Sequence, residues 1–270
     1  QNELADYNFD GSAMSVLMDL LAYNTHYNAF YLNMIVNEMF LDTASLRNSV
    51  VSRAKHLGYT PTSVRGAKAY VDLTITPANT PATIVIAKDT QFNAVVNGIS
   101  YVFSTSNSTT LNVNSNGVYT TANVELQQGI LLTHRYTANA SDPDQRFTLP
   151  NANTDTSSLV VQVQTSATSS NLHTYSVAND TTTINSTANV YFLEEDTDNK
   201  YRVYFGDGTI GRALTSGNII LLKSLIADAG ATNGARTFTP VSTVGGYSNV
   251  TVTTLSAASG GADRDSISDI

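Results

Sequence analysis

The segment from residue 10 to residue 59 constrains the fold most, because it carries more apolar helical surface than a lone domain of this size can bury. Between Ser12 and Phe40 there is neither Pro nor Gly. Within this run, apolar residues recur at spacings of 4, 3, 4, 3 and 4. That is the heptad pattern of a helix packed lengthwise against another helix. The seam residues are Val16, Leu20, Tyr23, Tyr27, Phe30 and Met34.

A second apolar stripe lies beside this seam on the same predicted helix. It consists of Met14, Leu17, Leu21, Tyr31 and Ile35, with Asn24 and Asn28 at the positions in between. Only a narrow strip is plainly polar: Ser15, Asp19, His26, Asn33 and Asn37. A surface helix of a globular domain has one apolar stripe and a broad polar face, so these proportions are reversed. We therefore expect this helix to bind neighbours on two sides.

Two interpretations of Asn24 and Asn28 remain open. Both side chains could face water at the edge of the apolar stripe. Alternatively, both could be buried at helix-packing positions, where a polar residue fixes register and partner number at some cost in stability.

The composition limits the function classes. The chain has 270 residues and a formal net charge of -8, and its 14 Lys and Arg residues are scattered. This pattern argues against nucleic-acid binding, which requires clustered basic residues. The absence of Cys excludes disulfides and thiolate metal sites and fits a reducing compartment. No apolar run reaches the roughly 20 residues that a membrane span requires, and no signal-peptide pattern is present.

Two helices are predicted in the first 66 residues. The long helix, capped by Asp10 or Ser12, has about 29 residues and a length of about 43 Å. A second helix, capped by Asp42 or Thr43, ends at Gly58, since a Gly with an apolar residue and a Pro shortly after it is a strong stop signal. The predicted apolar face of the second helix is Leu46, Val50, Ala54 and Leu57.

Residues 67–257 are predicted to form a β-rich domain. Residues 69–75 alternate apolar and polar side chains, as a half-buried strand does. Asn97-Gly98 is the preferred type I′ hairpin pair. Strands are predicted at 69–75, 91–96, 99–103, 117–126, 130–136, 159–164, 190–194, 200–205, 219–226 and 250–255. We expect an α+β protein whose helical N-terminal segment is followed by a mainly antiparallel, sandwich-like β domain, without a defined strand order.

The last residues, 258–270, are predicted to lead out of this domain. Small residues at 257–262 read as a linker, and 263–270 reads as the capped start of a helix. We expect the chain to be a fragment of a longer polypeptide; a disordered tail is the alternative.

Four groups of residues are candidates for catalytic or metal sites, and none fits one. Gly206–Gly211 satisfies G-x-G-x-x-G, but no helix pattern follows, so a turn is favoured over a dinucleotide site. Asp196 and Asp198 lack the remaining ligands of a calcium loop, and we expect a solvated hairpin there. Asp142 and Asp144, around Pro143, suit a turn. The four histidines, His26, His56, His134 and His173, have no partner at ligand spacing. We therefore expect no catalytic residue, metal or cofactor.

Several stretches also resemble the T4-type baseplate wedge proteins of contractile-tailed phages, within the baseplate J-like family. The match in residues 2–63 is long and specific and includes LLAYNT at 20–25, SLRNSVV at 45–51 and LGYTPTS at 57–63. Weaker matches follow in the right order: FGDG…GN at 204–218, a Gly-rich stretch at 230–234 and GGADRDSISDI at 260–270. Residues 80–187 match only in outline.

The resemblance implies a structural baseplate subunit without enzyme activity, metal or cofactor. It implies location in the virion tail baseplate after assembly in the host cytoplasm, and two copies per wedge. The N-terminal helices would join a bundle with the second copy and a neighbouring wedge protein, with no nucleic acid, membrane or small-molecule partner. The binding residues would be those of the two stripes and the two Asn positions between them.

Two alternatives remain. One is the equivalent subunit of a bacterial contractile injection system, although the 20–25 and 57–63 stretches favour the T4 type. The other is a carbohydrate-binding β module, suggested only by a Thr- and Asn-rich, Tyr-containing β block.

Overall fold

The computed structural model describes residues 13–114, 116–142, 144–178 and 181–270. The chain divides into two compact units: residues 1–59 with 266–270, and residues 60–265. The first unit is helical and the second contains all the strands. The caps predicted at Asp10 and Ser12 lie outside the described residues, as does Pro143.

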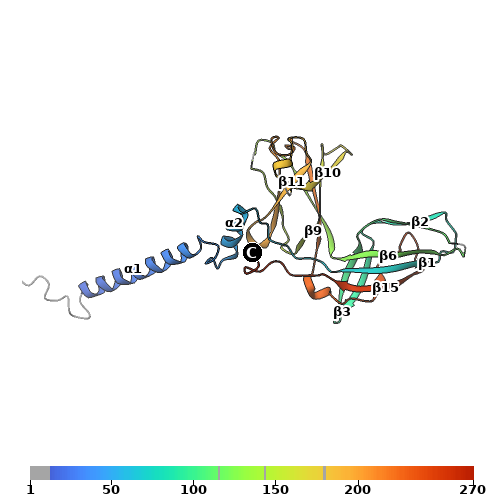
Figure 1. Ribbon diagram of the computed structural model, residues 1–270, viewed down its shortest axis with the longest axis horizontal. Coiled ribbons are helices and arrows are strands. Elements are labelled where there is room, and N and C mark those ends of the chain that lie inside the picture. Colours follow the sequence, from blue (N-terminus) through green and yellow to red (C-terminus); the bar gives the residue numbers. More distant parts are fainter. Residues whose placement is uncertain (1–12, 115, 143, 179–180) are drawn as a thin grey trace, which may run out of the picture. The chain divides into compact units, whose positions relative to one another are not determined.

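The helical unit contains α1 (Ala13–Asn37) and α2 (Arg47–His56). Figure 1 shows α1 as one uninterrupted helix; its 25 residues span about 37 Å. The helix ends three residues before the predicted Phe40. The reason is local: the Thr43 hydroxyl donates to the Asn37 carbonyl at 2.7 Å, which supplies a partner for an otherwise open helix end.

The start and the buried face of helix α2 differ from the prediction. Neither Asp42 nor Thr43 caps it, because the N-cap position is Leu46. Leu46 and the C-cap residue Leu57 flank the helix and stay exposed, so they do not belong to its buried face. That face is Val50, Val51 and Ala54.

The predicted stop of α2 at Gly58 is confirmed. Gly58 has φ +80° and donates to the Lys55 carbonyl at 3.0 Å, while Tyr59 N donates to the Ala54 carbonyl at 3.1 Å. This is a Schellman motif, which requires the left-handed backbone that Gly adopts at little cost.

Three sheets make up the second unit, and all but one of their strand pairs are antiparallel. The six-stranded sheet has the order β14-β3-β4-β6-β1-β15, the seven-stranded sheet β7-β13-β9-β10-β11-β12-β8, and the third is β2-β5. The strands are β1 (Lys68–Ile75), β2 (Thr83–Ile86), β3 (Gln91–Val96), β4 (Ile99–Thr105), β5 (Thr109–Asn112), β6 (Tyr119–Gln128), β7 (Ile130–Thr137), β8 (Phe147–Leu149), β9 (Thr154–Gln164), β10 (Leu172–Val177), β11 (Val190–Glu195), β12 (Tyr201–Phe205), β13 (Ile219–Ile226), β14 (Phe238–Pro240) and β15 (Val250–Ser259). Short 3-10 turns occupy Thr181–Thr183, Thr197–Asn199 and Ala229–Thr232.

The six-stranded sheet curls until its two ends meet. Gly234 N donates to the Ala258 carbonyl at 2.7 Å, and Ala258 N donates to the Ala235 carbonyl at 2.8 Å, which joins the approach to β14 with the end of β15. The curled sheet encloses a core that includes the inward side of β1. The largest fully buried members of this core are Leu73, Ile75, Ile86, Phe92, Phe103, Leu111, Tyr119 and Leu126.

A second core lies against the seven-stranded sheet and includes Leu149, Val161, Tyr201, Ile220 and Leu222. The predicted α+β class with mainly antiparallel strands is confirmed. The sandwich-like arrangement is wrong, because a sandwich shares one core between two stacked sheets. Here each large sheet buries its own cluster of apolar side chains.

Local strand predictions were accurate where the pattern was regular. The alternation in β1 is confirmed, since Ala69, Val71, Leu73 and Ile75 are all fully buried. The β3–β4 hairpin is confirmed with Asn97 at φ 51° and Gly98 at φ 82°, the two left-handed residues of a type I′ turn. The strands β2, β5, β8, β10 and β14 were not predicted.

The C-terminal residues differ in part from the prediction. Strand β15 continues to Ser259, so it includes the first three residues of the predicted linker. Residues 267–269 form a turn in place of a helix. In this turn the Asp269 carboxylate accepts from the Ser266 N–H at 2.8 Å and from the Ser266 hydroxyl at 2.7 Å. The bond to the N–H is the one that a carboxylate at position N3 of a capping box makes to the N-cap residue.

The two large sheets are joined at the end of β6. Gly129 separates β6 from β7, so one continuous segment passes from the first sheet to the second. Only Gly fits there: its φ is +141°, and a Cβ would lie 2.9 Å from Leu225 Cβ. Beside it, the Gln128 side-chain amide donates to the Asp228 carboxylate at 2.7 Å, and Asp228 N donates back to Gln128 at 2.9 Å.

A buried carboxylate completes this junction. Asp155 of β9 has no solvent exposure, and Oδ2 accepts from Gly66 N at 3.1 Å and from Gln127 Nε2 at 3.0 Å. Its Oδ1 accepts from the Ser157 N–H at 2.9 Å and hydroxyl at 2.6 Å. Asp155 thus ties the seven-stranded sheet to both the start of β1 and the end of β6.

Replacing Asp155 by Ala should lower the free energy of unfolding of the β unit by about 3 kcal/mol, because buried donors left without an acceptor cost about 1–3 kcal/mol each. Urea unfolding followed by the near-UV signal of the buried tyrosines measures this. Asp263→Ala removes the same charge from an exposed position and should change stability by less than about 0.5 kcal/mol. Equal effects of the two substitutions would contradict the role of Asp155.

Candidate functional site

The 13 residues predicted to bind partners all lie on α1, and all are exposed. None of the 25 residues of α1, every one of which the structure describes, is buried. The 11 apolar members of the predicted set expose between 40% and 64% of their surface. A soluble chain rarely leaves a contiguous apolar surface of this kind uncovered unless it is an interaction site.

The structure adds apolar residues that the sequence argument did not select. Met18, Leu32 and Val36 of α1 are also exposed, as are Met39 and Phe40 just beyond its end. Their side chains widen the apolar surface beyond the two predicted stripes. The signal was present in the sequence, because only five positions of the helix had been identified as plainly polar.

Aromatic side chains form a continuous ridge along α1. The ring centroids of Tyr23 and Tyr27 lie 4.4 Å apart, and those of Tyr27 and Tyr31 lie 6.2 Å apart. Phe30 meets Tyr31 edge to face at 5.9 Å. Residues four apart on a helix are neighbours, and ring pairs at these distances attract each other. The rings therefore support one another along this side of α1.

Asn24 and Asn28 contact each other one turn apart. The Asn28 amide Nδ2 donates to Asn24 Oδ1 at 3.0 Å, and both side chains are exposed. Whether a partner covers them stays a prediction.

The strongest motif of the β unit forms a turn, as predicted, and not a dinucleotide site. After β12, the Asp207 carboxylate accepts from Thr209 N at 2.8 Å and Ile210 N at 3.0 Å, and the chain then enters β13 without a helix. The hydrogen bonds from Ile210 and then Thr209 lower the pKa of Asp207. A Cβ at Gly206 would lie 2.2 Å from the Ile210 carbonyl, so this Gly serves the turn itself.

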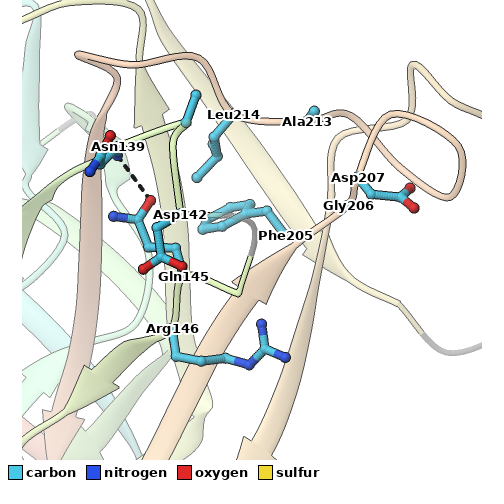
Figure 2. Close-up of a pocket in the computed structure, with 10 residues that line it drawn as sticks. Asn139, Asp142, Gln145, Arg146, Phe205, Gly206, Asp207, Ala213 and Leu214 are labelled. Atoms are coloured by element: carbon cyan, nitrogen blue, oxygen red, sulfur yellow. Dashed lines mark hydrogen bonds between the residues drawn. The ribbon is translucent and has the colours of Figure 1, made fainter.

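Figure 2 shows the shallow hollow beside this turn. Its volume of about 230 Å³ lies below the roughly 300–1,000 Å³ of ordinary ligand sites. The Asp207 carboxylate points away from the other lining side chains. Arg146 lies 4.3 Å from the centre of the Tyr204 ring and 3.6 Å from the Glu194 carboxylate. The charged groups do not converge on a common point where a substrate could react.

The other candidate groups also have structural roles. Asp196 and Asp198 flank the β11–β12 turn, as predicted for a hairpin, and Asp196 pairs with Arg202 at 3.1 Å. Asp142 accepts from Asp144 N at 3.1 Å within a turn. The four histidines lie on four different elements. Among the residues whose positions are described, no three His, Cys, Asp or Glu side chains are grouped to hold a metal ion. No helix within the described ranges combines the length and apolarity needed to cross a membrane.

The N-terminal part of the chain is similar to known proteins. The family described as baseplate wedge protein gp6-like, helical domain, matches residues 1–59. A stretch of 94 residues is 48% identical to the baseplate wedge protein gp6 of Enterobacteria phage T4. The alignment with the phage T4 protein covers 35% of this chain and 14% of that relative.

Within the helical unit, one carboxylate links the two helices. Glu38, just after α1, accepts from the Ser45 N–H at 2.9 Å and hydroxyl at 2.7 Å, and from Leu46 N at 3.3 Å. These bonds form in place of the cap predicted at Asp42 or Thr43, since α2 begins only after Leu46. Negative charge near a helix N-terminus is favourable, so the position of Glu38 beside the start of α2 adds to the stability of this connection.

The hydrogen bonds from the Ser45 hydroxyl, the Ser45 amide and the Ser49 hydroxyl hold the pKa of Glu38 at about 2, below its ordinary value of 4.5. Because the pKa of Glu38 is lower in the folded chain than in the unfolded chain, its ionised carboxylate stabilises the fold at pH values above 4.5. This stabilisation is lost as the pH falls from 4.5 to about 2. The Ser45 and Leu46 amide NMR shifts should therefore titrate with a midpoint near pH 2.

Glu38→Gln is the matched variant for this measurement. It keeps an acceptor but removes the ionisation, so the titration of the two amides should disappear. A midpoint near 4.5 in the unaltered protein would show that the carboxylate is not held by these donors.

Proposed function

We propose that this chain is a structural subunit of a contractile phage tail baseplate wedge, and that α1 is its assembly surface. The observation that carries the proposal is the exposed apolar surface of α1, which lies within the residues that the gp6-like helical domain family matches. The name of the phage T4 relative places that protein in the baseplate wedge.

The size of the apolar surface suits a stable assembly. Fully burying one large apolar side chain contributes about 1.5–3 kcal/mol. Association costs roughly 4–15 kcal/mol in lost freedom of motion. Because 11 of the predicted residues are large, apolar and exposed, burying about half of them offsets that cost.

The apolar surface is divided into two stripes, and we assign each to a different neighbour. One contacts a second copy of this chain and the other contacts neighbouring wedge proteins, in the tail baseplate of the virion after assembly in the host cytoplasm. We assign no catalytic role, cofactor, metal, nucleic acid, membrane insertion or small-molecule substrate. The turn geometry of Gly206–Gly211 and the non-convergent charges beside it support a non-enzymatic role.

Leu20→Asp or Tyr27→Asp should abolish co-purification with the wedge partners, since burying a carboxylate in an apolar interface is strongly unfavourable. The β unit should remain folded, which its near-UV spectrum and urea midpoint report. Asn33→Asp adds the same charge to the polar strip of α1 and should leave assembly unchanged. Normal assembly of the Leu20 and Tyr27 variants would count heavily against the proposal.

Replacing both Asn24 and Asn28 by Leu tests whether these residues are buried in the bundle. If they are, the assembled bundle should become more heat-stable and more variable in copy number, because a polar seam residue restricts partner number. Light scattering and thermal unfolding of the assembled complex measure both properties. Unchanged copy number and stability would place both amides at a solvated edge.

A further inference from the structure

A cleft in the β unit has the features of a binding site, separate from α1. It has a volume of about 460 Å³, within the range of ordinary ligand sites. Its floor is one face of the seven-stranded sheet, where Lys223 of β13 is opposite Thr133 of β7 and Val160 of β9. Its wall includes Ser104 and Gln127 of the six-stranded sheet and Lys88 of the loop between β2 and β3.

The loop that carries Lys88 is fixed by the protein. The Thr105 hydroxyl donates to the Ala87 carbonyl at 2.9 Å and accepts from Thr90 N at 3.0 Å. Asp89 N donates to the Thr105 carbonyl at 3.0 Å. On the floor, Ser158 accepts from Leu225 N at 2.9 Å. The cleft is therefore pre-organised, which reduces the entropy lost on binding.

Two polar groups in the lining have no partner in the structure. Ser104 is only 3% exposed, and its hydroxyl makes no hydrogen bond. The Gln162 Oε1 atom is likewise buried without a donor, although its Nε2 donates to Thr174 at 3.4 Å. Buried polar groups normally have partners, so a pair of unpaired ones in one cleft indicates a missing ligand or solvent.

The charge of the cleft is opposite to that of the chain. Lys88 and Lys223 outnumber the single lining carboxylate, Asp89, whereas the whole chain has a net charge of -8. Neither lysine has an ion-pair partner within the described ranges. Arg135 extends the positive charge along β7. It is two residues after Thr133, so both side chains lie on the same face of the strand, and it is paired with Leu221 of β13. The lining has no aromatic side chain on which a sugar ring could stack.

We propose that this cleft binds an extended, acidic polypeptide segment of another protein. The two lysines would pair with its carboxylates, Ser104 would donate to a carboxylate or carbonyl oxygen, and Gln162 Oε1 would accept a backbone N–H. The apolar floor residues Leu131, Val160 and Leu225 suit the aliphatic part of such a segment. In choosing a polypeptide over a free metabolite, the inference rests on the proposed role in a multi-protein assembly.

Fluorescence anisotropy with an N-terminally labelled, C-amidated Gly-Glu-Ser-Glu-Gly peptide tests the proposal on the 270-residue chain. The peptide should bind, and higher ionic strength should weaken binding because the contacts are charge-assisted. The Lys88→Met/Lys223→Met double variant should bind about tenfold more weakly or worse, as expected when charged hydrogen bonds are lost. Lys200→Met, at the β11–β12 turn, is the matched control and should bind normally.

Three outcomes would overturn the proposal. The first is no binding of the peptide, and the second is equal binding of the same peptide with both Glu residues replaced by Gln. The third is displacement of the peptide by inorganic phosphate at equal concentration. The last would show a small-anion site instead. Leu20→Asp, which disrupts the assembly surface on α1, should leave peptide binding intact. Failure of the cleft and failure of the assembly proposal are therefore distinguishable.

Discussion

The β unit depends on the buried carboxylate of Asp155, which has no ion-pair partner within the part of the chain that the structure describes. Burying an ionised carboxylate is costly unless its oxygens are fully hydrogen-bonded. Asp155 meets this condition with four donors, two from its own turn and two from Gly66 and Gln127. Because Gly66 precedes β1 and Gln127 is the next-to-last residue of β6, the same carboxylate aligns both sheets. Gln127 and Ser157 also line the cleft, so its shape follows from this network.

The helical unit differs from the β unit in how much of its apolar surface is covered. The β unit pairs its strands and encloses two apolar clusters, so most of its apolar surface is already covered. Helix α1 buries none of its residues. An isolated helix of 25 residues gains only modest stability from its own backbone, and most helical stability in proteins comes from packing of an apolar face. Folding of α1 and association with a partner are therefore expected to reinforce each other.

The sequence predicted the elements whose causes are local. The alternation in β1, the Asn97-Gly98 turn and the Gly58 stop depend on neighbouring residues only, and all three are confirmed. The sequence did not predict features that depend on residues far apart in the chain. Glu38 accepts from the Ser45 amide, seven residues away and just before α2, and the cleft joins strands that only the sheet order brings together. Short strands such as β2 and β5 have four residues each, which is too few for a clear period.

The hydrogen bond between Asn24 and Asn28 bears on both interpretations of these residues, the solvated edge and the buried helix-packing position. Each side-chain amide offers two N–H donors and a carbonyl oxygen with two lone pairs. The bond between them uses one donor of Asn28 and one lone pair of Asn24. The pair keeps part of its hydrogen-bonding capacity inside the helix, and the remaining donors and acceptors are free to bond to water or to a facing helix. A partner that supplies matching amides could therefore bury the pair without breaking the bond, whereas an apolar partner surface would leave several groups unsatisfied. A partner helix with amide side chains opposite Asn24 and Asn28 is therefore favoured over one with apolar side chains there.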